Sequence, residues 1–155
     1  MKKYIFIGVI AGMAFLATAG SALACSCVVP DPSRSMKSYV LDAKSNATAI
    51  FVGTVVSVRY SEEKMNGTPI KRFAKFKVER SWKGPTTEFI EIESANICCI
   101  CGIDFEAGQK WIVYSNSTGP DSLNASSCSR TSSVKDKSDD EKYLGKARKV
   151  KKLSK

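Results

Sequence analysis

Six cysteines are the residues of this chain whose type and spacing bear most directly on chemistry. They form three groups, which are Cys25 with Cys27, then Cys98, Cys99 and Cys101, and finally Cys128 alone. An even number of cysteines in a small exported domain favours disulfide bonds over free thiols, although the spacing leaves their pairing open. The sequence therefore predicts a cross-linked domain.

Two other chemistries use the same sulfur atoms. Cys98 and Cys101 form a Cys-X-X-Cys motif, which is catalytic in oxidoreductases that lower the pKa of one thiol. Such motifs begin a helix after a strand, whereas here Gly102 and a predicted loop follow. A third interpretation is a site for a soft metal such as copper, with thiolate ligands from Cys25, Cys27, Cys98, Cys99 and Cys101.

The first 24 residues have the three parts of a secretory signal peptide. Lys2 and Lys3 supply the positive start, residues 4–19 are apolar, and Ala22-Leu23-Ala24 is a small-X-small cleavage site. Cleavage there makes Cys25 the first residue of an exported chain, either secreted or periplasmic. Two alternatives are an uncleaved membrane anchor and a lipoprotein acylated on Cys25. No later apolar run is long enough to span a membrane.

Histidine is absent from the chain. This absence excludes Ser-His-Asp and Cys-His catalysis, a histidine general base and histidine-ligated zinc. The acidic residues are scattered along predicted strands and the tail rather than paired on a loop. The chain is therefore predicted not to be an enzyme and to carry no intrinsic cofactor.

The formal net charge of +9 is concentrated at the C-terminus, where residues 135–155 hold nine basic and four acidic side chains. A basic tail can contact a polyanionic surface, although such tails are more often only solvated. The body has no basic face interleaved with aromatic residues, so no nucleic-acid partner is expected.

Periodicity predicts a mainly β domain over residues 25–134, and then a basic helix or tail over residues 135–155. Five strands are expected, at residues 48–60, 72–82, 87–94, 110–116 and 122–127, where β-branched or alternating apolar residues are frequent. In the second of these, the residues predicted to face the core are Ala74, Phe76, Val78 and Trp82. Gly53 predicts a bulge, and Asn66-Gly67 predicts a tight turn.

Two helices are expected to flank these strands. Residues 33–44 have Met36, Val40 and Ala43 at helical spacing. In the tail, Ser138 and Glu141 form a capping-box pattern before an apolar stripe of Tyr143, Leu144, Ala147 and Val150. Short strands with turn signals and no βαβ alternation together indicate a small closed β-barrel.

The start Cys25-Ser26-Cys27, with Asp31-Pro32 shortly after it, resembles the N-terminal segment of the tissue inhibitors of metalloproteinases. Residues 66–85 are similar to that family's Gly-X-Pro-Ile-Lys-Arg strand and its closing Lys-Gly-Pro turn, and Cys101-Gly102 and Cys128 match in order. The resemblance implies a netrin-like domain, which is an OB-fold-like five-stranded closed barrel. It also implies the disulfides Cys25–Cys101 and Cys27–Cys128.

In this family, the first residue of the mature chain chelates the catalytic zinc of a metalloprotease through its backbone amine and carbonyl. The resemblance gives this role to Cys25 and places the Ser26 side chain in the protease specificity pocket. The implied contact ridge consists of Cys25, Ser26, Cys27, Val28, Val29, Asn96 and Ile97, and the implied partner is a zinc metalloprotease. The alternative is an exported OB-fold binding module, lipidated or not, without inhibitory activity.

The chain departs from the family pattern in three respects. Asp31 stands where the family has histidine before Pro32, the first predicted helix lacks the cysteine of a third disulfide, and the basic tail replaces a disulfide-rich C-terminal subdomain. Cys98 and Cys99 consequently have no implied partner. A vicinal disulfide, free thiols and pairing between molecules all stay open for them.

Overall fold

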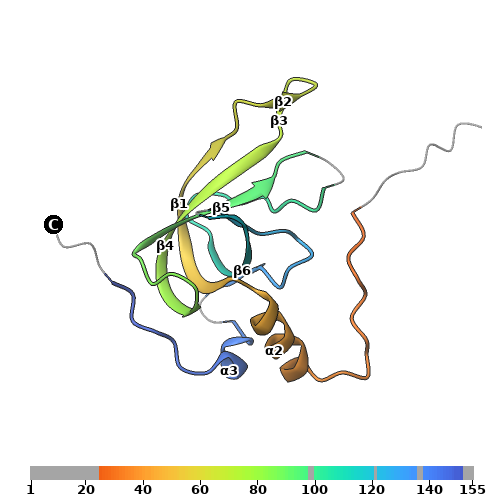
Figure 1. The fold of residues 1–155 in the computed structure, drawn as a ribbon, viewed down its shortest axis with the longest axis vertical. Helices are drawn as coiled ribbons and strands as arrows, with labels where there is room; N and C mark the ends of the chain where they lie inside the picture. The colour runs from red at the N-terminus through yellow and green to blue at the C-terminus, as the bar shows by residue number, and fades with distance from the viewer. Residues whose placement is uncertain (1–24, 98–99, 121, 136–137, 152–155) are drawn as a thin grey trace, which may run out of the picture.

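The computed structural model describes residues 25–97, 100–120, 122–135 and 138–151, and its long strands close into a barrel (Figure 1). The ring runs in the order β1, β4, β5, β7, β6, and β6 pairs back to β1. Its members are β1 (Ala49–Tyr60), β4 (Lys71–Lys83), β5 (Phe89–Ala95), β6 (Lys110–Gly119) and β7 (Ser122–Asn124). The prediction of a mainly β, OB-fold-like, five-stranded closed barrel is confirmed.

Three short strands complete the described sheet structure. β2 (Lys64–Met65) and β3 (Thr68–Pro69) form a hairpin, and β8 (Ser132–Ser133) pairs with β6. Asn66 and Gly67 join the hairpin with φ angles of 51° and 81°, as the predicted tight turn requires. The fifth predicted strand is too long, because β7 ends at Asn124 and the chain then turns, with the Ser129 N–H donating to the Ser126 carbonyl.

Alternation along β4 builds the barrel interior. Ala74, Phe76 and Val78 are buried, whereas Lys75 and Lys77 are exposed. A chain of edge-to-face aromatic contacts crosses this interior, with ring centroids 5.1 to 5.4 Å apart, through Phe51, Phe76, Phe105 and Trp111. Such contacts add to the stabilisation from burial alone. Trp82 is also buried, but in a second cluster with Val40, Ile50 and Leu144.

Gly53 lies where β1 changes partners. The register of the β1–β4 ladder shifts between Val52 and Gly53, while Ala49–Thr54 also pair with β6. A Cβ at position 53 would lie 2.8 Å from the Lys77 carbonyl oxygen. The predicted bulge is confirmed, and it allows β1 to curl around the barrel and close it.

Helix α2 (Met36–Asn46) begins three residues later than predicted. Ser35 is its N-cap, and the Ser35 hydroxyl accepts a hydrogen bond from the Ser38 N–H over 3.2 Å. Val40 and Ala43 pack against the second cluster, as predicted, whereas Met36 is 51% exposed. The apolar face that the helix packs against the barrel is therefore narrower than the spacing of its apolar residues predicts.

The predicted C-terminal helix is wrong beyond its first turn. Helix α3 (Glu141–Leu144) is one turn long and ends at Gly145, whose φ of 81° leaves the helical region. Residues 145–151, called here the strap, pass along the end of β4 and the connection that follows it. The Arg148 N–H donates to the Ser81 carbonyl and the Lys151 N–H to the Thr86 carbonyl, each over 2.7 Å. Two hydrogen bonds to the barrel thus hold the segment where the sequence predicts further helical turns.

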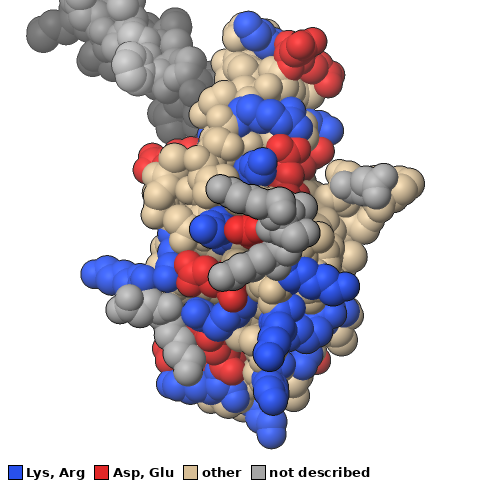
Figure 2. Space-filling view, turned by 90° about the vertical axis from the view of Figure 1, so that its left-hand side faces the viewer, with Lys and Arg blue, Asp and Glu red and all other residues tan. Residues whose placement is uncertain are grey.

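The strap lies on a basic face of the molecule. Lysine and arginine side chains gather in the lower half of this face (Figure 2). The strap contributes four exposed basic residues, Lys146, Arg148, Lys149 and Lys151. Among the described residues, no helix has the length and apolarity needed to cross a membrane.

Two buried acidic residues of the tail hold α3 against the barrel. Asp140 accepts hydrogen bonds from the Tyr114 hydroxyl over 2.9 Å and from two nitrogens of Arg130. Glu141 pairs with Arg80 over 3.1 Å. Burial, reinforced by the Asp140 carboxylate, raises the pKa of Tyr114 well above its ordinary value.

The connection from β5 to β6 inserts two side chains into the barrel core. Ile103 and Phe105 are buried, and the Ser94 hydroxyl bridges two backbone groups beside them. It donates to the Ala125 carbonyl over 2.8 Å and accepts from the Ile103 N–H over 2.9 Å. One hydroxyl therefore ties the loop after β5 to the loop after β7.

Replacing Ser94 with alanine should lower the free energy of unfolding by about 1–3 kcal/mol, because a buried N–H and a buried carbonyl lose their partner. Urea unfolding with the disulfides intact measures this change. The control is Ser57→Ala on the exposed side of β1, which should change stability by less than about 0.5 kcal/mol. Equal effects of the two substitutions would contradict the bridging role of Ser94.

Alkaline pH should destabilise the fold through Tyr114. Above about pH 10 an unfolded tyrosine ionises while the buried one keeps its proton, so the unfolded state binds fewer protons and stability falls. Tyr114→Phe should remove as much as about 1.4 kcal/mol per pH unit from the slope of stability against pH in this range. Urea unfolding of the natural chain and the variant at a series of pH values measures this slope.

Candidate functional site

The N-terminal segment Cys25–Pro30 lies on the outside of the barrel without regular secondary structure. In Figure 1 it is the orange coil that runs down the right-hand side of the molecule toward α2. Every residue in it is exposed, and the Val28 and Val29 side chains are 96% and 84% exposed. These two adjacent side chains leave apolar surface in contact with water.

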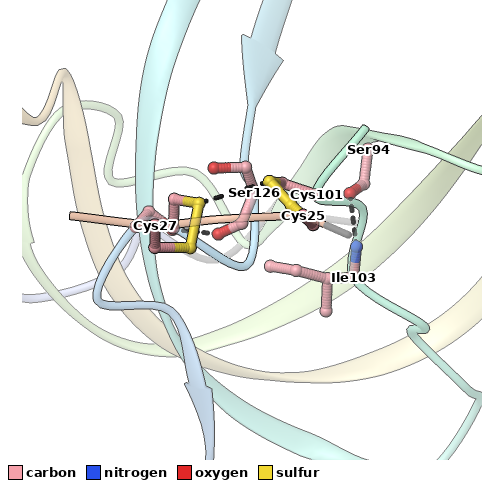
Figure 3. The surroundings of a disulfide bond; sticks show 8 residues. Cys25, Cys27, Ser94, Cys101, Ile103 and Ser126 are labelled. Atoms are coloured by element: carbon pink, nitrogen blue, oxygen red, sulfur yellow. Dashed lines mark hydrogen bonds between the residues drawn. A yellow bond between two sulfur atoms is a disulfide. The ribbon is translucent and has the colours of Figure 1, made fainter. Parts of the chain in front are cut away.

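Two disulfides fasten the start of this segment to the barrel (Figure 3). Cys25 is joined to Cys101 and Cys27 to Cys128, with Cα atoms 5.3 and 5.2 Å apart. The structure thus has the pairing that the resemblance implies. The closed loops have sequence separations of 76 and 101. The chain-entropy model values one such closure at about 4.5 kcal/mol, and two overlapping loops do not add fully.

The sheet topology brings the two barrel cysteines together. β5 and β7 are parallel neighbours, so the loops that follow them emerge at the same end of the barrel. Cys101 follows β5, Cys128 follows β7, and the Ser127 N–H donates to the Cys101 carbonyl over 2.8 Å. The Cys101 and Cys128 sulfur atoms lie 3.3 Å apart.

Close backbone packing fixes the position of Cys101. A Cβ on the next residue, Gly102, would lie 2.8 Å from the Ala95 carbonyl carbon, so the loop can approach β5 only because that residue is glycine. Cys101 itself has a φ of 36°, in the left-handed region. The N-terminal segment is thereby attached to a rigid part of the barrel.

Asn96 and Ile97, which the resemblance assigns to the contact ridge, border the same depression as Cys25. The three residues line a depression of about 360 Å³ together with Arg72, Cys101, Gly102, Ile103, Asp104 and others. The Asn96 side chain is occupied within the barrel, since it accepts from Arg72 over 3.1 Å and donates to the Pro69 carbonyl over 2.8 Å. Asn96 therefore positions the loop rather than offering a free side chain. Cys98 and Cys99 lie outside the described residues, so the predictions for them stay untested.

Asp31 has a structural role in this region that sequence reasoning missed. Its carboxylate accepts hydrogen bonds from the Ser33 N–H and hydroxyl over 2.9 and 2.8 Å. The backbone hydrogen bond from Ser33 lowers the pKa of Asp31. Aspartate commonly stabilises turns in this way, and here the turn leads the segment into α2. The Asp-Pro-Ser sequence was the available signal.

A groove runs beneath the other side of the N-terminal segment, and it too was not foreseen from the sequence. It has a volume of about 550 Å³ between the segment, α2 and β6. Val28 and Val29 form one wall, and Tyr39 and Ala43 of α2 form another. The Tyr39 hydroxyl donates to the Asp31 carbonyl over 2.7 Å, which ties α2 to the turn. The Val28 and Val29 side chains thus line this groove and are also exposed to solvent.

Comparisons with known proteins do not identify a family for this chain. No protein-family model matches the chain, and no curated protein matches it either.

Proposed function

We propose that the chain is an inhibitor of zinc metalloproteases that acts through a free N-terminal Cys25. The observation that carries the proposal is the attachment of an exposed N-terminal segment to two neighbouring barrel loops through Cys25 and Cys27. Membership of the netrin-like inhibitor family is part of this proposal, and so is export with cleavage after Ala24. The OB-fold-like barrel and the residues that resemble that family support it.

The chemistry requires one open position on the protease zinc. A catalytic zinc keeps such a position for water or substrate. A neutral α-amine and the carbonyl oxygen of the same residue reach one metal ion together in a five-membered ring, and this expels the nucleophilic water. In the proposed complex Cys25 supplies both atoms, and the Ser26 side chain enters the specificity pocket.

The two disulfides supply the preorganisation that tight inhibition needs. A free peptide loses conformational entropy when it is ordered in a protease cleft, and this loss weakens binding. Cys25 and Cys27 are already held before any protease binds, and Cys101 is fixed by its packing against β5. The exposed side chains of Val28 and Val29 would then lie along the cleft.

Adding one alanine before Cys25 of the processed chain should strongly weaken inhibition, because the zinc-binding nitrogen becomes an amide. We expect inhibition constants against a panel of zinc metalloproteases to rise by about a hundredfold or more, the equivalent of roughly 3 kcal/mol. Circular dichroism and disulfide mapping serve as controls, since the barrel and both cross-links should be unchanged. Equal inhibition by both forms would refute the amine mechanism, and inhibition by neither would favour the non-inhibitory binding module.

Inhibition should also weaken as the pH falls through the pKa of the α-amine. An ordinary α-amine has a pKa of about 7.7–8, and only its neutral form can bind zinc. Below that pKa the inhibition constant should rise by as much as about tenfold per pH unit. Dividing by the inhibition constant of the alanine-extended chain at each pH removes the titration of the protease itself. A flat ratio would contradict zinc binding by the amine.

A further inference from the structure

The two disulfides lie so close together that their sulfur atoms are in contact. The sulfur atoms of Cys25, Cys101 and Cys128 all lie within 4.8 Å of one another, and those of Cys101 and Cys128 are 3.3 Å apart. Cys27 is not one of these three residues, but its bond to Cys128 holds its sulfur next to them. Figure 3 shows the two disulfides side by side, joined by that sulfur–sulfur contact.

We propose that the thiol form of the chain binds one soft metal ion, Zn²⁺ or Cu⁺, through Cys25, Cys27, Cys101 and Cys128. This site is independent of the proposed inhibitory function, because it exists only before the disulfides form. It differs from the grouping that the sequence suggested, because it leaves out Cys98 and Cys99 and includes Cys128, which the fold brings beside Cys101.

The spacing of the sulfur atoms suits tetrahedral coordination. Zinc–sulfur bonds are about 2.3 Å long, so the thiolates of a tetrahedral site lie about 3.8 Å apart. The one contact between sulfur atoms that are not bonded to each other, Cys101 to Cys128, is 3.3 Å long and so lies close to this spacing. Soft thiolate ligands select Zn²⁺ and Cu⁺ over Ca²⁺ and Mg²⁺.

The four ligands combine rigid and adjustable supports. Cys101 is fixed by the packing of Gly102 against Ala95, and the neighbouring Ser127 ties the loop of Cys128 to Cys101. Cys25 and Cys27 lie on an exposed segment without regular structure, which can shift to complete the coordination shell. In the proposed site Cys101 and Cys128 stay in place, and Cys25 and Cys27 adjust to complete the tetrahedral geometry of the metal.

Metal binding involves proton loss and no transfer of electrons. Four thiols and one Zn²⁺ give a tetrathiolate complex of charge −2 and release four protons to solvent. Arg72 lines the same depression as Cys25 and Cys101, and its guanidinium offsets part of that negative charge. Because bound thiolates are not free to be oxidised, the metal and the disulfides compete for the same sulfur atoms.

The test uses the full chain, reduced with a phosphine and handled without oxygen. Titration with Cd²⁺, a spectroscopic substitute for Zn²⁺, should give an ultraviolet thiolate-to-metal charge-transfer band that saturates at one ion per chain. X-ray absorption of the Zn²⁺ form should show four sulfur ligands at about 2.3 Å. Cys27→Ser and Cys128→Ser should each weaken binding by more than about 10²-fold, since even the loss of an outer-sphere partner costs 10–100-fold.

The matched control is the double variant Cys98→Ser with Cys99→Ser, which should bind Cd²⁺ as tightly as the natural chain. Failure to bind one ion, unchanged binding in Cys128→Ser, or loss of binding in the double variant would each overturn the proposal. Where the metal-free thiol form lacks the circular dichroism of a β-barrel, Cd²⁺ should restore it. Binding without that recovery would show an unstructured thiol site and would equally overturn the proposal.

Discussion

Pairing of β1 along both of its edges is the constraint on which the rest of the molecule depends. β1 pairs with β4 on one side and with β6 on the other, and Gly53 permits the change of direction between them. β7 then completes the ring between β5 and β6 and runs parallel to β5. That single parallel contact places the loops after β5 and β7 at one end. The cysteines of the site therefore meet because of how the barrel closes.

The elements that sequence reasoning predicted well are those whose signal is local. Alternation along β4, the bulge at Gly53 and the turn at Asn66-Gly67 each depend on neighbouring residues, and all three are present. The C-terminal helix failed because its apolar stripe competes with main-chain hydrogen bonds to β4, and the sequence contains no signal for these. The Asp140–Tyr114 contact joins residues 26 apart in sequence and is equally invisible to periodicity.

The candidate site was likewise only partly predictable from the sequence. The exposed start of the chain and its cysteines could be identified from the sequence, but their spacing left the pairing open. A family resemblance supplied the pairing, and the fold gives its physical reason. The inward-facing side chain of Asn96 and the groove beneath Val28 depend on tertiary packing, which no local pattern encodes. Sequence reasoning thus found the reactive groups, whereas their surroundings came only from the fold.

The distance along the chain between Cys27 and Cys128 has a consequence for the order of events during synthesis. Cys27 leaves the ribosome 101 residues before its partner, which corresponds to roughly 5–20 s at typical elongation rates. Neither native cross-link can form until β5 and the loop after it exist, and the second must wait for β7 as well. A nascent chain therefore carries Cys25 and Cys27 as unpaired thiols until these later segments are made, and Cys27 waits for the last barrel strand.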